Sequence, residues 1–170
     1  MMSSMRLLLA TLGVALLPAL AHADLPHAGT WRLVGSATAA RDAAVERATE
    51  DMSVFTRGIA RRRLRAGTPV HQRVVIEEKP GGVRVALGEA YDVTARLGGP
   101  AVATRDAWDN ALQATHRRSG RRLVQRLVGE DATVTHTLQL SEDGATLTLT
   151  VRIESHHLPG DVVYRARYRR

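Results

Sequence analysis

The stretch that decides the fold spans residues 132–155 and reads ATVTHTLQL-SEDG-ATLTLTVRIES. Apolar residues and one histidine occupy every second position of its two arms, and threonines fill most of the positions between them. A period of two is typical of antiparallel strands that are buried on one face. The SEDG segment carries turn residues, and Gly144 can adopt the positive φ that hairpin turns need. The stretch therefore predicts a β-hairpin.

The same alternation recurs on both sides of this hairpin. It predicts further strands at residues 29–34, 72–78, 83–87, 91–97, 101–104, 108–116, 121–128 and 162–169. Short turns rich in glycine and proline separate these strands, and helices do not alternate with them. Closing such a meander removes the exposed sheet edges that favour aggregation. The sequence thus predicts a mainly β fold, an antiparallel up-and-down β-barrel of 8–10 strands.

One segment, at about residues 37–66, departs from the two-residue period. It carries a stripe at steps of three and four, as on one face of a helix. The stripe comprises Arg41, Val45, Ala48, Met52, Phe55 and Ile59. Gly58 interrupts the segment and is a candidate for a break into two helices. We therefore expect a helical segment after the first strand, placed over the mouth of the barrel.

The N-terminus has the pattern of a cleaved secretory signal peptide, residues 1–23. Arg6 precedes a short apolar run, and an A-x-A motif ends at Ala23. The apolar run is too short to span a bilayer as a helix. We expect cleavage between Ala23 and Asp24, which leaves residues 24–170 as a single barrel domain in the periplasm or outside the cell. The chain has no cysteine, so disulfides and a lipid-modified cysteine are excluded.

The charge balance is basic, with a formal net charge of +7 at pH 7. A basic balance is typical of contact with nucleic acid, anionic lipid or another polyanion, and the expected export argues against nucleic acid. Arginines crowd the end of the helical segment, where they suit either an anionic membrane surface or a solvated helix end. These arginines are Arg61, Arg62, Arg63 and Arg65.

The order of elements resembles that of the calycin superfamily, which includes lipocalins, avidins and fatty-acid-binding proteins. Gly29-Thr30-Trp31 matches the Gly-x-Trp opening of lipocalins. The fatty-acid-binding proteins have a similar opening and a helical lid between their first two strands. The resemblance implies a barrel that holds a small hydrophobic ligand. It also implies a late arginine packed over Trp31 as a cation–π partner, here Arg165, Arg167 or Arg169.

The resemblance stops at the residues that would hold a carboxylate. Fatty-acid-binding proteins use an Arg-x-Tyr pair on the last strand, whereas Ala166 stands two residues before Tyr168 in this chain. The expected ligand-facing residues are instead the aromatic and histidine side chains of the predicted inner face. They are Trp31, Tyr91, Trp108, His116, His136, Tyr164 and Tyr168.

Two functions follow from this pattern. The first is an exported binding protein for a small hydrophobic or amphipathic ligand held inside the barrel. The alternative is an envelope interaction or structural module with a filled barrel, contacting anionic lipid or a polyanion through its arginines. The inner face contains both large and small residues, so the sequence leaves both open, together with the ligand and the oligomeric state.

No motif indicates catalysis, a cofactor or a metal. The chain has no Gly-x-Ser-x-Gly elbow and no H-x-x-x-H or H-x-E spacing. His156 and His157 are adjacent, and we interpret them as surface or hydrogen-bonded histidines. We therefore predict a protein that is not an enzyme and that has no cofactor and no metal ligands.

Overall fold

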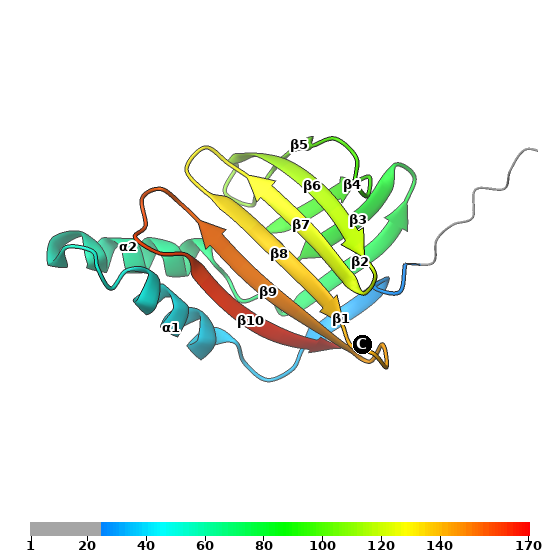
Figure 1. The fold of residues 1–170 in the computed structure, drawn as a ribbon, viewed down its shortest axis with the longest axis horizontal. Helices are drawn as coiled ribbons and strands as arrows, with labels where there is room; N and C mark the ends of the chain where they lie inside the picture. Colours follow the sequence, from blue (N-terminus) through cyan, green and yellow to red (C-terminus); the bar gives the residue numbers. More distant parts are fainter. Residues whose placement is uncertain (1–24) are drawn as a thin grey trace, which may run out of the picture.

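A computed structural model describes residues 25–170, so the predicted signal peptide and its cleavage site lie outside the described residues. Ten strands form one antiparallel sheet in the order β4-β3-β2-β1-β10-β9-β8-β7-β6-β5, with two helices after β1 (Figure 1). The elements are β1 Gly29–Leu33, α1 Thr38–Ala48, α2 Val54–Gly67, β2 Arg73–Lys79, β3 Gly82–Leu87, β4 Tyr91–Ala95, β5 Val102–Arg105, β6 Ala111–Ser119, β7 Arg122–Val128, β8 Thr133–Leu140, β9 Thr146–Glu154 and β10 Val162–Arg169. Within residues 25–170, none of the helices has the length and apolar character needed to cross a bilayer.

The sheet curls into a nearly closed barrel because β1 pairs with both β2 and β10. The two end strands, β4 and β5, approach each other without forming a ladder. The gap is bridged by single bonds, from Gly98 N–H to the His116 carbonyl at 2.8 Å and from Ala107 N–H to the Ala90 carbonyl at 3.1 Å. The predicted mainly β, up-and-down barrel is therefore confirmed, with ten strands.

The predicted hairpin is formed by β8 and β9. Leu138 lies opposite Leu149 and Leu140 lies opposite Leu147, so both arms turn their leucines to the same face. These leucines are buried, and the threonines between them are partly exposed. Gly144 has a φ of 68° in the turn, as the sequence predicts. A slip of one residue would turn these leucines outward, so their burial sets the register.

The barrel interior is filled by side chains from all around the wall. Ile76, Leu87, Leu123, Leu127 and Trp31 are bulky and have no exposed surface. Burial of each such side chain contributes about 1.5–3 kcal/mol to stability. The part of the interior that these side chains occupy is therefore closely packed.

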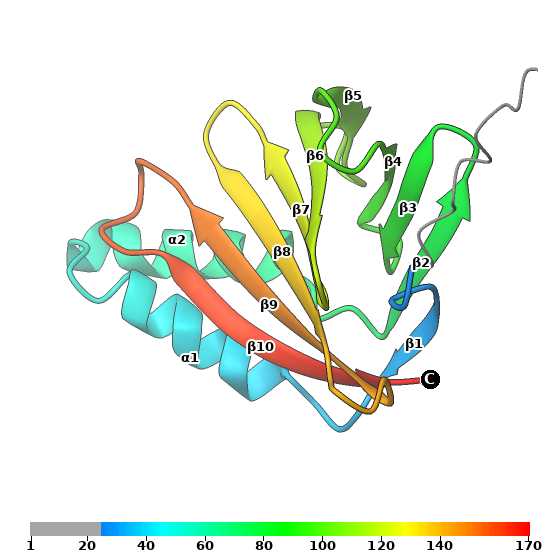
Figure 2. The same cartoon turned by 45° about the vertical axis from the view of Figure 1, so that its right-hand side comes forward.

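The helical segment is divided into two helices, and the division lies at residues 49–53 instead of at Gly58. Helix α1 buries Val45 and Ala48 and runs alongside β10 (Figure 2). In α2 the predicted apolar stripe is wrong, because Phe55 is 92% exposed and Ile59 is also exposed. The chain turns between the helices, so residues that would continue the stripe on one straight helix face solvent instead.

Candidate functional site: a groove over buried histidines

A groove of about 520 Å³ lies where several strands end at the rim of the barrel. Three segments line it: residues 69–73 between α2 and β2, residues 88–90 in the β3–β4 turn, and residues 107–108 in the β5–β6 loop. Its volume falls within the range of about 300–1,000 Å³ that small-molecule sites occupy. Both apolar and charged side chains line the groove, which suits an amphipathic molecule.

Hydrogen bonds hold the groove walls in place. One carboxylate oxygen of Asp106 accepts the backbone N–H groups of Trp108 and Asn110, each at 2.9 Å, and so shapes the β5–β6 loop. Across the groove, the Tyr168 hydroxyl donates to the His71 carbonyl at 2.8 Å and the Tyr164 hydroxyl donates to the Pro69 carbonyl at 3.4 Å. The two tyrosines, predicted to face a ligand, thus fix the wall that residues 69–71 form.

Three polar aromatic side chains meet beside this wall. The ring centroids of Tyr91 and His136 are 5.1 Å apart, and His71 lies 6.0 Å from Tyr91 and 6.2 Å from His136. Their exposed fractions are 6% for His71, 7% for Tyr91 and 1% for His136. Within residues 25–170, neither the Tyr91 hydroxyl nor the His71 ring has a hydrogen-bond partner. The polar atoms of this cluster are not among the fully enclosed atoms that lack a partner, so the cluster has free capacity for a hydrogen-bond partner.

A directed chain of hydrogen bonds supports the cluster from inside the barrel. His116 Nδ1 lies 3.0 Å from the Val83 carbonyl, which can only accept, so this nitrogen carries the proton. The neutral ring then accepts at Nε2 from the Gln125 amide nitrogen at 3.1 Å. The Gln125 amide oxygen in turn accepts from His136 Nδ1 at 2.9 Å. The chain therefore leaves His136 Nε2 as an acceptor on the side away from Gln125.

Burial keeps the members of this network uncharged. It lowers the pKa of His136 to about 3 and that of His71 to about 4. It also lowers the pKa of His116 and raises the pKa of Tyr91 to about 12. At neutral pH the cluster consequently offers neutral hydrogen-bond donors and acceptors, and no formal charge.

Trp31 belongs to the core and not to the groove. Its indole N–H donates to the His27 carbonyl at 2.9 Å, and the Arg170 guanidinium carbon lies 4.6 Å from the ring centroid. The expected cation–π contact therefore exists, but its partner is Arg170. The three predicted partners alternate with the buried residues of β10 and point outward, which is why the prediction was wrong for Arg165, Arg167 and Arg169.

Trp108 occupies a loop instead of the predicted strand and is 46% exposed at the groove rim. The structure thus brings Tyr91 and His136 together, joins His116 to them through Gln125, and leaves Trp108 above them. Gln125 and His71 were missed from the sequence. Gln125 alternates with two inward leucines of β7, a pattern that was sufficient to find it. No local pattern marks His71.

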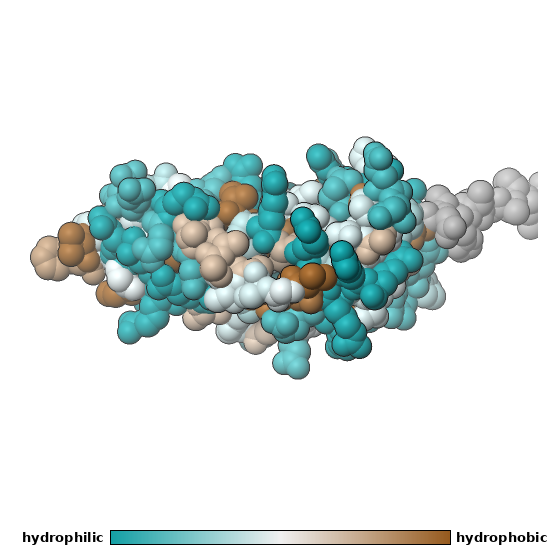
Figure 3. Space-filling model, turned by 90° about the horizontal axis from the view of Figure 1, so that it is seen from below, coloured by the Kyte–Doolittle hydropathy of each residue, from teal (hydrophilic) through white to brown (hydrophobic). Residues whose placement is uncertain are grey.

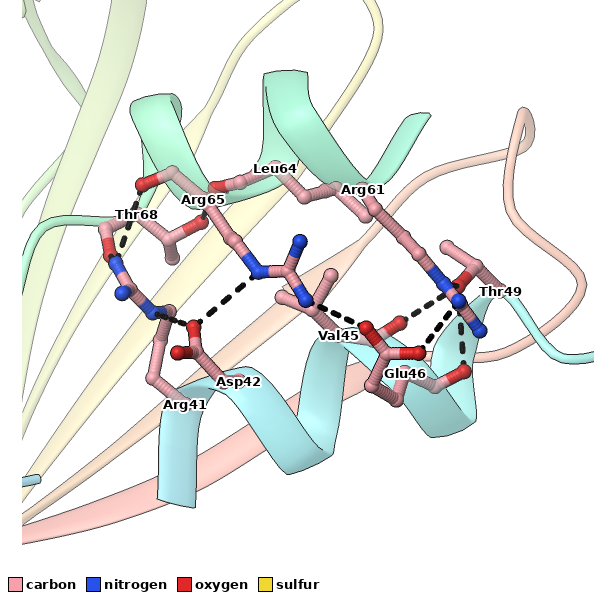
Figure 4. Close-up of polar contacts among 9 residues, drawn as sticks. All are labelled: Arg41, Asp42, Val45, Glu46, Thr49, Arg61, Leu64, Arg65 and Thr68. Carbon is pink, nitrogen blue, oxygen red and sulfur yellow. Dashed lines mark hydrogen bonds and ion pairs between the residues drawn. The ribbon is translucent and has the colours of Figure 1, made fainter. Parts of the chain in front are cut away.

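The four arginines of α2 that were predicted to contact an anionic surface divide into two groups, and the first, Arg61 and Arg65, is drawn in Figure 4. Arg61 and Arg65 form ion pairs with Glu46 of α1 at 2.6 and 2.5 Å, and Arg65 also lies 3.4 Å from Asp42. Arg41 of α1 donates to the carbonyls of Arg65 and Thr68, both at 3.2 Å, and so caps the C-terminus of α2. Two of the four arginines predicted to contact an anionic surface are therefore engaged by the neighbouring helix.

The other two arginines, Arg62 and Arg63, are exposed and form no ion pair within the described part of the chain. They lie on the same helix as two exposed apolar residues, Val54 and Phe55. A hydrophobic area is visible at the end of the molecule where the two helices meet (Figure 3). These residues form a second surface feature, separate from the groove.

The ten strands, the single gap and the two helices after β1 are similar in fold to the barrels of fatty-acid-binding proteins. Similar solved structures include fatty-acid-binding protein 1 of Echinococcus granulosus, with a TM-score of 0.54, 13% identity and coverage of 85% of this chain and 97% of that one. Lipid binding protein 8 of Caenorhabditis elegans has a TM-score of 0.54, 10% identity and coverage of 85% and 95%. The fatty acid binding protein of Schistosoma mansoni has a TM-score of 0.52, 17% identity and coverage of 85% and 96%. These likenesses confirm the calycin resemblance at the level of the fold.

No family model matches the sequence, and no curated protein matches it either. Sequence similarity therefore assigns no activity to the chain.

Proposed function

We propose that this protein binds a small amphipathic molecule in the groove, with an uncharged polar group of the ligand directed toward Tyr91, His71 and His136. The observation that carries the proposal is a cluster of largely buried, neutral polar side chains beside an open groove, in which the Tyr91 hydroxyl and the His71 ring have no hydrogen-bond partner within residues 25–170. An apolar part of the ligand would lie against Val70 and Trp108. The protein is proposed as a binding protein, with no enzymatic role and no cofactor.

The barrel interior supports a ligand with an uncharged polar group. Among residues 25–170 the buried polar side chains are histidines, threonines, tyrosines and one glutamine, with no arginine, lysine, aspartate or glutamate. A carboxylate placed beside them would lose hydration without gaining a buried cation. At the rim, Arg73 and Glu89 carry opposite charges, so they add no net charge to the groove lining. An alcohol or amide group that donates to His136 Nε2 meets no such penalty.

Fluorescence titration with a long-chain alcohol and the fatty acid of equal length tests this proposal. The half-exposed Trp108 should report binding, and the alcohol should bind more tightly than the acid. Changing Tyr91→Phe removes one hydroxyl without opening a cavity and should weaken alcohol binding by about tenfold, the scale of one hydrogen bond. Phe55→Ser, on the exposed end of α2, is the control and should bind as wild type.

Each outcome bears on a different part of the proposal. Absence of saturable binding for both compounds would remove groove binding altogether. Tighter binding of the acid would retain the groove and overturn the preference for an uncharged group. Equal alcohol affinity in wild type and in Tyr91→Phe would exclude the polar cluster from recognition.

We further propose that the chain is exported and acts in the periplasm or outside the cell. The pattern of the N-terminal residues supports this, with cleavage after Ala23. Mass spectrometry of the protein recovered from a bacterial periplasm would test it, and the expected N-terminus is Asp24. Recovery of the uncut chain from the cytoplasm would contradict export.

A second candidate function is contact with an anionic membrane surface through α2. The observation in its favour is the exposure of Val54 and Phe55 on a helix that also carries the exposed Arg62 and Arg63. Apolar side chains beside cations match the chemistry of a lipid headgroup region. The filled barrel interior also agrees with an interaction module that holds no ligand inside.

Retention on liposomes with and without anionic lipid tests this second function. The double change Arg62→Ala and Arg63→Ala should abolish salt-sensitive retention. Arg165→Ala with Arg167→Ala removes the same charge from the outer face of β10 and is the matched control. If the α2 variant is retained as well as wild type, membrane contact through α2 is wrong.

A further inference from the structure

Two hairpin turns lie next to each other at the end of the barrel that the helices adjoin (Figures 1 and 2). They are residues 129–132 between β7 and β8, and residues 155–161 between β9 and β10. Thr133 pairs with Glu154 at the base of the two turns. The Ser155 hydroxyl donates to the Asp131 carbonyl at 2.8 Å and joins the turns directly. Their side chains are therefore held near one another.

Three potential metal ligands meet where the turns touch. One nitrogen or oxygen each from Asp131, His156 and His157 all lie within 4.8 Å of one another. His157 Nε2 is 3.4 Å from the Asp131 carboxylate, and the ring centroids of His156 and His157 are 3.8 Å apart. Ligands bound to one ion at about 2.0–2.2 Å are separated by a little over 3 Å. The exposed side chains need only small rotations to reach that arrangement.

The surroundings favour a cation although the whole chain is basic. A depression of about 320 Å³ beside the cluster is lined by Glu130, Glu154 and Asp161 as well as by Asp131. Arg152 forms ion pairs with Glu154 and Asp161 at 3.6 and 2.5 Å, and its single positive charge offsets one of these two negative charges. Glu130 has no ion pair within residues 25–170, so its carboxylate can hold a water bound to the ion or serve as a further ligand.

We propose that Asp131, His156 and His157 form a binding site for a divalent transition-metal ion such as Zn²⁺, which links the two turns. Two imidazole nitrogens and one carboxylate oxygen suit zinc and the neighbouring late first-row metals. Calcium and magnesium prefer all-oxygen sites, so they are disfavoured here. Three protein ligands leave at least one position for water. The site shares no residue with the groove, and it is an alternative to the sequence-based prediction that the chain has no metal ligands.

Calorimetric titration of the tag-free protein with ZnCl₂ tests the site. Wild type should bind one ion per chain, and His156→Ala with His157→Ala should weaken binding by more than about tenfold. Asp131→Asn should weaken it to a lesser degree. Glu142→Ala removes an exposed carboxylate from the β8–β9 turn at the opposite end of β8 and should leave binding unchanged. Binding absent in wild type, or equal in the double variant, would overturn the proposal.

The position of the ion can be mapped separately with Cu²⁺, which broadens nearby amide signals in NMR spectra. Broadening should centre on residues 129–132 and 155–159, and it should disappear in the double histidine variant. Residues 141–144, in the β8–β9 turn, should keep their signals. Broadening centred on His71 and the groove instead would place the metal elsewhere and contradict the site.

Discussion

Helices α1 and α2 follow each other in the chain but are attached to the barrel in different ways. Helix α1 buries Ala44, Val45 and Ala48, and it contacts β10. Helix α2 has no buried residue; only the partly buried Leu64 packs against the core, and ion pairs with Asp42 and Glu46 join the helix to α1. Burial contributes more than exposed ion pairs, which are worth about 0–1 kcal/mol each. We infer that α1 is part of the cooperative core, whereas α2 separates from it at small cost.

The groove wall formed by residues 69–73 is attached to the barrel and not to α2. The carbonyls of Pro69 and His71 accept hydrogen bonds from Tyr164 and Tyr168 of β10. These bonds begin immediately after the end of α2. Helix α2 can therefore move away from the barrel while residues 69–73 keep the groove wall in place. The boundary between the movable helix and the fixed wall lies near Thr68.

The largest expected effect comes from a charge placed in α1. Val45 has no exposed surface, so Val45→Asp buries a carboxylate without a partner and should lower the free energy of unfolding by at least about 3 kcal/mol. The matched change Ile59→Asp on exposed α2 should alter it by less than about 0.5 kcal/mol. Urea denaturation measures both. Equal losses in the two variants would contradict the distinction between the helices.

A smaller effect on the free energy of unfolding is expected from lowering the pH, because it involves the buried histidines of the barrel interior. The folded-state pKa of His136 is about 3 and that of His71 is about 4, both below the ordinary value of 6.5. The unfolded chain therefore takes up protons below pH 6.5 that the folded chain does not, and stability falls as the pH is lowered toward 4. For His136 alone, the loss between pH 7 and pH 5 is about 2 kcal/mol.

Urea melts at pH 7 and pH 5 would measure this dependence. His136→Gln keeps a polar group at the position but removes the titration, so its stability should change less between the two pH values. A wild-type protein that is equally stable at pH 7 and pH 5 would show that these histidines are not buried as described.

The smallest effect is expected at the ion pairs of α2. Glu46→Gln should lower the free energy of unfolding by about 1 kcal/mol or less, because its partners Arg61 and Arg65 are partly exposed. Hydrogen exchange should nevertheless become faster across residues 54–67, and it should stay unchanged in β8 and β9. High salt should have the same local effect in wild type. Uniform acceleration over the whole chain would show that α2 is part of the core.

Much of the wall of the barrel was predictable from short-range pattern. Leu147, Leu149 and Val151 alternate with threonines, and the strand they form is buried on the predicted side. Helix boundaries were less predictable, because the three- and four-residue stripe continues through the turn at residues 49–53. Thr49 ends α1 by donating its hydroxyl proton to the Val45 carbonyl at 2.8 Å. A local side-chain bond of this kind competes with the helix and leaves little trace in hydrophobic periodicity.

The candidate sites were likewise predictable only where local periodicity marks their residues. Tyr91 and His136 were predicted as ligand-facing residues because each lies on an inward, alternating position. Of the two groups that complete their surroundings, Gln125 occupies an inward position of β7 that alternation marks, whereas His71 lies in a connecting segment without periodicity. Likewise Asp131 meets His157 only because β8 and β9 place their two adjoining turns side by side.

The sequence alone determined the antiparallel strands, their inward faces, the glycine turns and the resemblance to calycins, because these depend on neighbours two to four residues apart. Only the tertiary structure decided that Arg170 covers Trp31, that Arg61 and Arg65 are held by α1, and that neutral histidines meet beside an open groove. Such contacts join residues distant in the chain, and they depend on the path of the chain around the barrel. Periodicity predicts which face of a strand is buried. Closure of the barrel decides which side chains from other strands and loops that face contacts.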